Sequence, residues 1–184
     1  MSEQVYSARR GAVLRPFAGF GPLPPLTRFS LWGDLARMAD ALAPALLPVS
    51  QQACRAVEAE ACAALWLGPD EQLLLAAGER DSARLAELLR MSLADVPHSL
   101  TDISHRQTAF EVTGPNARTL LNTGCPLDLG EAAFPQGMCT RTLFEKVEIV
   151  LWRKAADSFH IEVWRSFAPH LTRLLAQAAG ELLA

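Results

Sequence analysis

One close grouping in the chain could do acid–base or nucleophilic chemistry, namely Asp102, Ser104 and His105. Such catalysis needs two or three polar groups brought together and activated by their surroundings. Successive side chains of a strand point to opposite faces, so Ser104 and His105 do not share a pocket if a strand runs through them. We therefore expect Asp102 and Ser104 to bond to neighbouring backbone at the end of a strand, as short polar side chains do.

The cysteines and histidines, which could serve redox chemistry or bind a metal, are dispersed along the chain. No CxxC or other short ligand spacing links the cysteines, so neither a zinc site nor a redox pair is predicted. We expect four reduced thiols, mostly buried, as is usual in the cytoplasm. Each histidine is expected to be a surface residue or a satisfied core residue. The residues concerned are Cys54, Cys62, Cys125 and Cys139, and His98, His105, His160 and His170.

Short sequence motifs of cofactor sites and hydrolases are also missing. Gly19-Phe20-Gly21 has no strand before it and no third glycine after it, and Pro22 follows directly, so it is not a dinucleotide-binding loop. No GxSxG, HExxH, P-loop or paired-carboxylate motif occurs elsewhere. The sequence therefore predicts no catalytic, cofactor-binding or metal-binding residue in this chain.

The composition favours a protein with a buried partner surface. The chain has 184 residues and a mass of 20.0 kDa, and half of its residues are hydrophobic while 20% are charged. A net charge of −3 with scattered arginines argues against nucleic acid as a partner. No apolar run approaches the ~20 residues that cross a bilayer, and residues 1–21 are too polar for a signal peptide. We expect a cytoplasmic protein that does not bind a membrane.

The elements that must position any site are clearest in residues 99–121, which read as strand, turn, strand and helix. Phe110 and Val112 share one face of the second strand, the two-residue period of a half-buried strand. Gly114 and Pro115 end that strand and start a helix. Gly124 stands where a left-handed helix cap is expected.

Alternating apolar residues predict further strands at residues 26–32, 61–67, 72–77, 140–144, 147–151 and 159–163, with a turn at 68–71. Helices are expected after Asp34, Asp81 and Ser166, each a suitable N-cap. The buried stripes predicted for the second and third of these helices include Leu85, Leu88 and Leu89, and Leu171, Leu174, Leu175, Ala178 and Leu182.

This order of elements predicts an α+β fold, in which antiparallel sheets carry packed helices in two ferredoxin-like halves. We place the halves at about residues 26–97 and 98–184. Residues 1–25 precede them as an extended arm, because proline and glycine between residues 11 and 25 prevent a helix. The arm is apolar for a solvated tail, and we expect it to lie on a partner subunit.

Several motifs support a resemblance to known families. Asp102-Ile103-Ser104, then Phe110-Glu111-Val112-Thr113-Gly114 and a helix at 117–121, resemble the folate-dependent aminomethyltransferase superfamily. Together with five further segments, these motifs resemble the gamma-subunit family of heterotetrameric sarcosine oxidases, and the resemblance covers about residues 26–182. Those segments are residues 67–75, 124–129, 134–137, 141–142 and 165–168.

That resemblance implies a fold like part of an aminomethyltransferase and a structural, non-catalytic role beside alpha, beta and delta subunits. Such complexes oxidatively demethylate sarcosine to glycine. It also implies that flavins and a nicotinamide dinucleotide lie in the alpha and beta subunits and zinc in delta, with no cofactor in this chain.

A departure from the family pattern bears on activity. Aminomethyltransferases carry glycines and an acidic pair at the turn between two C-terminal strands, where this chain has Phe144-Glu145-Lys146-Val147-Glu148. Glu145 and Glu148 are expected at the solvated edge of a strand. The alternatives are a free-standing folate-dependent aminomethyl-transfer protein and a free-standing small-molecule-binding protein.

Overall fold

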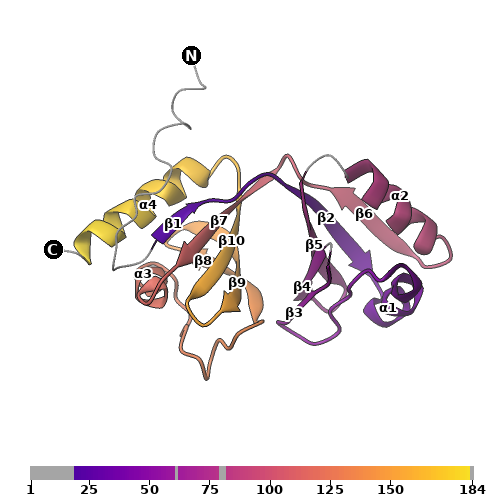
Figure 1. Ribbon diagram of the computed structural model, residues 1–184, viewed down its shortest axis with the longest axis horizontal. Coiled ribbons are helices and arrows are strands. Elements are labelled where there is room, and N and C mark those ends of the chain that lie inside the picture. Colours follow the sequence, from indigo (N-terminus) through magenta and orange to yellow (C-terminus); the bar gives the residue numbers. More distant parts are fainter. Residues whose placement is uncertain (1–18, 61, 79–81, 183–184) are drawn as a thin grey trace, which may run out of the picture.

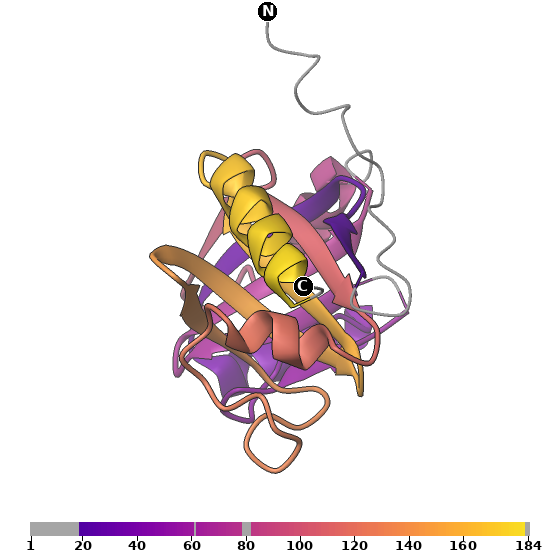
Figure 2. The same ribbon diagram turned by 90° about the vertical axis from the view of Figure 1, so that its left-hand side faces the viewer.

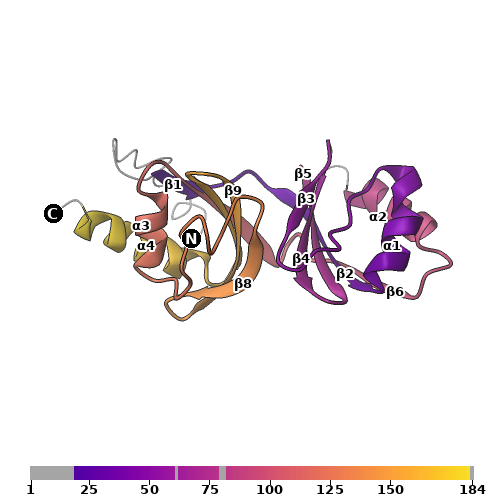
Figure 3. The same cartoon turned by 90° about the horizontal axis from the view of Figure 1, so that it is seen from below.

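The computed structural model describes residues 19–60, 62–78 and 82–182. Within them the chain forms two five-stranded antiparallel sheets that face each other, and helices cover the outer face of each sheet (Figure 1). Seen from below, the four layers run helix, sheet, sheet, helix (Figure 3). The predicted α+β class is confirmed.

The first sheet has the strand order β3-β4-β5-β2-β6. Its strands are β2 (Leu26–Gly33), β3 (Ala56–Glu58), β4 (Cys62–Gly68), β5 (Glu71–Ala77) and β6 (His98–Asp102). Its helices are α1 (Leu35–Leu42) and α2 (Ser82–Ser92), with a 3-10 turn at Ala43–Ala45. The Asp34 carboxylate accepts the N–H groups of Ala36 and Arg37, so it caps α1 as predicted.

The second sheet has the order β1-β7-β10-β9-β8. Its strands are β1 (Gly19–Pro22), β7 (Gln107–Thr113), β8 (Cys139–Phe144), β9 (Val147–Ala155) and β10 (Ser158–Trp164). Figure 2 shows α3 (Ala117–Asn122) and α4 (Ala168–Glu181) lying across its outer face. Phe110 and Val112 are buried beneath these helices, as the strand periodicity predicts.

Both sheets contain the strand arrangement of a ferredoxin-like half, with one additional edge strand each. In the first sheet that arrangement is β6-β2-β5-β4, and β3 is the addition. In the second it is β1-β7-β10-β9, and β8 is the addition. The chain crosses between the sheets twice at one side of the molecule, once between β1 and β2 and once between β6 and β7 (Figure 1). As a result β1 pairs with β7 in the second sheet, and β6 pairs with β2 in the first.

These crossings correct two predicted boundaries. β6 pairs with β2, so residues 98–102 belong to the first half, and the change of sheet falls between Asp102 and Gln107. The expected arm at residues 1–25 ends in β1, which pairs with β7 of this same chain, because an edge strand tolerates the proline at its end. Residues 1–18 of the arm lie outside the described residues.

Three local predictions were wrong. Ser166 does not cap α4, whose N-cap residue is Phe167 and lacks a side-chain cap bond. Leu88 of α2 is 40% exposed, since the helix buries its Ala86 and Leu89 side instead. Gly124 does not take a left-handed φ. A Cβ there would lie 2.9 Å from the Phe144 ring, so the position requires glycine for space. Asp81, the predicted cap of α2, lies outside the described residues.

Candidate functional site

The predicted grouping of Asp102, Ser104 and His105 does not form a site. Ser104 is buried, and its Oγ accepts the backbone N–H of Arg28 at 2.9 Å. Asp102 Oδ1 accepts the backbone N–H of Ser104 at 2.9 Å, while His105 is exposed. The two short side chains therefore close the end of β6 against β2, which confirms the expected bonding to backbone.

The thiols are free, as predicted. Cys62, Cys125 and Cys139 are buried, and Cys54 is partly buried. Burial raises the pKa of Cys62, and it raises that of Cys139 to about 12. These two thiols are therefore protonated and poorly reactive at neutral pH.

The histidines lie at the surface or are satisfied in the core, as predicted. His105 and His170 are exposed, and His98 is partly buried. His160 is the satisfied core histidine, and its Nε2 lies 2.8 Å from Glu162 Oε1. Across residues 19–60, 62–78 and 82–182, no group of three metal-ligating side chains comes together. No helix in this part of the chain is long and apolar enough to span a bilayer.

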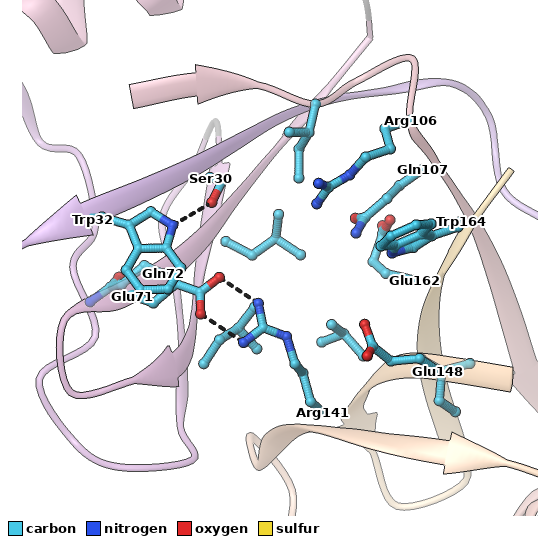
Figure 4. A pocket seen from close by; sticks show the side chains of 15 residues that line it. Ser30, Trp32, Glu71, Gln72, Arg106, Gln107, Arg141, Glu148, Glu162 and Trp164 are labelled. Atoms are coloured by element: carbon cyan, nitrogen blue, oxygen red, sulfur yellow. Dashed lines mark hydrogen bonds and ion pairs between the residues drawn. The ribbon is translucent and has the colours of Figure 1, made fainter. Parts of the chain in front are cut away.

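A cleft with a volume of about 440 Å³ lies between the two sheets (Figure 4). The inward-facing layer of both sheets is apolar in one region, where Leu65, Leu73, Val150 and Trp152 pack with Cys139. Elsewhere in this layer the inward positions are polar, and the cleft opens there. Its polar and aromatic lining residues are Ser30, Trp32, Glu71, Gln72, Arg106, Gln107, Arg141, Glu148, Glu162 and Trp164.

An ion pair between Glu71 and Arg141 joins the sheets across this cleft. Glu71 begins β5 and Arg141 lies on β8, and the guanidinium donates from both Nη atoms to the two carboxylate oxygens, with an Nη1–Oε2 distance of 2.7 Å. The hydrogen bonds that Arg141 donates to the Glu71 carboxylate raise the pKa of Arg141, and the negative charge of Glu148 adds to this. A bidentate pair of this kind fixes both distance and orientation.

A second, deeper network links the sheets through Glu162 on β10. Its Oε2 accepts from Arg28 Nε at 2.6 Å, and its Oε1 lies 2.8 Å from His160 Nε2. Arg28 also donates from Nη1 to the Leu26 carbonyl at 2.9 Å. Arg28, His160 and Glu162 are each at most 3% exposed. Both oxygens of this buried carboxylate are occupied by partners within the protein, so the group is unsuited to act as a free base.

The mouth of the cleft carries groups that these two networks leave unused. The Arg106 guanidinium lies 5.3 Å from the centre of the Trp164 ring, and Trp32 donates from its indole N–H to Ser30 Oγ at 2.9 Å. Both tryptophans are 42% exposed. Gln107 is 7% exposed, and its Oε1 has no hydrogen-bond partner among the described residues.

Glu145 and Glu148, which stand where aminomethyltransferases carry an acidic pair, lie in different surroundings. Glu145 sits in the β8–β9 turn with a positive φ of 56°, and it is exposed. Glu148 is also exposed and lines the cleft. Both are solvent-exposed, but only Glu145 lies at an edge as expected, because Glu148 belongs to the inner strand β9. In the described part of the chain no hydrogen bond joins the two.

The cleft residues were not predicted as a group from the sequence. Glu71 carried a signal, because it shares its strand face with the apolar Leu73 and Leu75. Glu162 carried none, because alternation puts it on the face opposite Ile161 and Val163, and that face is buried only by the other sheet. Such positions require a partner, but the alternation does not say which distant residue supplies it.

Comparison of the sequence with known proteins identifies a family. Residues 35–181 match the model of the sarcosine oxidase, gamma subunit family. The chain is 34% identical over 149 residues to a sarcosine oxidase subunit gamma from Corynebacterium sp. strain P-1, covering 81% of this chain and 71% of that protein.

Two solved structures share the fold. A chain of the heterotetrameric sarcosine oxidase from Corynebacterium sp. U-96, solved with pyrrole 2-carboxylate, superposes with a TM-score of 0.80 at 25% identity. The match covers 91% of this chain and 86% of that one. The glycine cleavage system aminomethyltransferase T from Bartonella henselae has a TM-score of 0.60 at 15% identity over 86% of this chain and 45% of that one, a likeness of fold alone. The chain belongs to the sarcosine oxidase gamma subunit family.

Proposed function

We propose that this chain is a non-catalytic, structural subunit of a heterotetrameric sarcosine oxidase, in which alpha, beta and delta subunits are its partners. The complex would oxidatively demethylate sarcosine to glycine, with the chemistry in the partner subunits. The observation that carries the proposal is the likeness of 91% of the chain, at a TM-score of 0.80, to a chain of a heterotetrameric sarcosine oxidase.

The state of the polar groups supports a structural role. Glu71 and Glu162 are engaged by arginines on the opposite sheet, and Ser104 is engaged by backbone. Catalysis would require a nucleophile and a base within hydrogen-bond reach of each other and open to a substrate. In the described residues the ion pairs instead join the two sheets, which is what a rigid scaffold requires.

Cofactor binding is assigned to the partners on the same reasoning. A flavin or a nicotinamide dinucleotide needs a phosphate-cradling loop, and the sequence has none. The family resemblance implies that the flavins and the dinucleotide of the complex lie in the alpha and beta chains and the zinc in the delta chain. A cytoplasmic location remains a prediction from the sequence.

Co-expression of this chain with its partner subunits tests the proposal. The purified complex should contain this chain in stoichiometric amount, hold flavin, and produce glycine from sarcosine. This chain purified alone should be colourless, without oxidase activity, and without folate binding in calorimetry. Failure to co-purify with large flavoprotein subunits, or flavin or folate retained by the isolated chain, would refute it.

A further inference from the structure

We propose that the cleft between the two sheets binds a small zwitterion with a flat apolar side chain, of the chemical class of the aromatic α-amino acids. This site is separate from the structural role proposed above, and it is built from cleft groups that make no hydrogen bond to the two ion-pair networks.

The first requirement comes from Gln107 at the start of β7. Its side chain is more than nine-tenths buried, it lines the cleft, and its Oε1 has no partner within the described residues. A buried carbonyl oxygen without a donor lowers stability, and such groups in native proteins usually have a reason. A ligand at this position should therefore present an N–H or O–H group.

The second requirement comes from two opposite charges at the same cleft. Neither Arg106 nor Glu148 has an ion-pair partner within 4.0 Å among the described residues. In Figure 4 they enter the cleft from opposite ends, with Gln107 and Trp164 between them. A guanidinium binds a carboxylate and a carboxylate binds an ammonium group, so this arrangement fits a zwitterion better than a simple anion or cation.

The third requirement comes from the size of the cleft and its aromatic walls. Small-molecule sites typically measure about 300–1,000 Å³, and this one measures about 440 Å³. Glycine would leave most of that space unfilled. The half-exposed rings of Trp32 and Trp164, with Ile103 and Leu73, supply flat and apolar contact for a side chain.

Isothermal titration calorimetry of the full-length chain tests this site, with L-phenylalanine as the probe. We expect saturable binding of L-phenylalanine and at least tenfold weaker binding of glycine and of N-acetyl-L-phenylalaninamide. The first lacks the side chain, and the second lacks both charges. Equal binding of the uncharged amide would show that the cleft accepts an aromatic side chain of a polypeptide, and it would overturn the proposal. Absence of binding at millimolar concentration would also overturn it, leaving a cleft filled by water.

Variants separate recognition from folding. Arg106→Gln and Glu148→Gln change exposed side chains and should each weaken binding at least tenfold without changing the melting temperature. Gln107→Leu should abolish binding while the melting temperature of the ligand-free protein stays constant or rises, because the unpaired amide is removed. Arg118→Gln on the exposed side of α3 is the matched control and should bind normally. Normal binding by Gln107→Leu and Arg106→Gln would refute the assignment, whatever their stability.

Discussion

Replacing Glu162 with glutamine should destabilise this protein far more than removing an exposed carboxylate. Glu162 and Arg28 are 1% and 2% exposed, and they join β10 of one sheet to β2 of the other at 2.6 Å. Glutamine keeps the shape of the side chain but leaves the Arg28 guanidinium without a counter-charge where water does not reach. Breaking a buried pair in this way typically costs about 3–5 kcal/mol.

Urea unfolding of the purified chain measures this cost. With a denaturant slope of about 1–3 kcal/mol per molar urea, the midpoint should fall by about 1 M or more. Glu87→Gln is the matched control, because its pair with Arg90 spans 3.9 Å and both side chains are more than 60% exposed. That variant should lose no more than about 1 kcal/mol.

A double-variant cycle shows whether the loss comes from the pair. The cycle consists of Arg28→Met, Glu162→Leu and the double variant that carries both. The double variant removes both charges, so it should lose less stability than the two single variants added together, with a coupling of about 1–3 kcal/mol. A loss below about 1 kcal/mol for Glu162→Gln would place the pair among exposed ones. Additive single effects would likewise refute the claim that this pair holds the sheets together.

Four further predictions rest on particular contacts. Ser104→Ala should cost about 1–3 kcal/mol by leaving the buried Arg28 N–H unpaired, against about 0.5–1.5 for Asp102→Ala, and neither should change turnover per flavin of an assembled complex. Equal losses in urea melts would contradict this difference. Deleting residues 1–25 should lower the melting temperature because it strips β1 from β7. A truncated chain that melts at the same temperature as the full-length chain would mean that β1 adds nothing to the sheet. A thiol reagent at pH 8 should modify Cys54 first and spare Cys62 and Cys139 until the chain is unfolded, which a mass measurement checks. Because unfolded Cys139 ionises near its ordinary pKa of 9.0 and the buried thiol near 12, its ionisation should lower stability progressively as the pH rises through that interval and have no effect below it. Fast labelling of Cys139 in the native chain would overturn that reasoning.

Short-range signals in the sequence were enough to predict the class of fold and every strand except β1 and β3. Two-residue alternation located the predicted strands, and Asp34 marked the start of α1, because both signals depend on residues that are neighbours in the chain. The hydrogen bonds of Asp102 and Ser104 to backbone were predictable for the same reason, because short polar side chains at the end of a strand usually bond to backbone. The motifs in their order also sufficed to indicate the family that the comparisons then showed.

Which strands share a sheet and which charged side chains meet depends on contacts between distant parts of the chain. Alternation puts Glu162 on the face opposite Ile161 and Val163, and only the packing of one sheet on the other buries that face and brings Arg28, 134 residues away, to the carboxylate. In the same way β6 joined the first sheet and β1 the second, because pairing between distant segments depends on register and on the crossing of the chain. Gln107 gave no signal in the sequence, since a buried amide becomes an unpaired one only when every group around it has been placed.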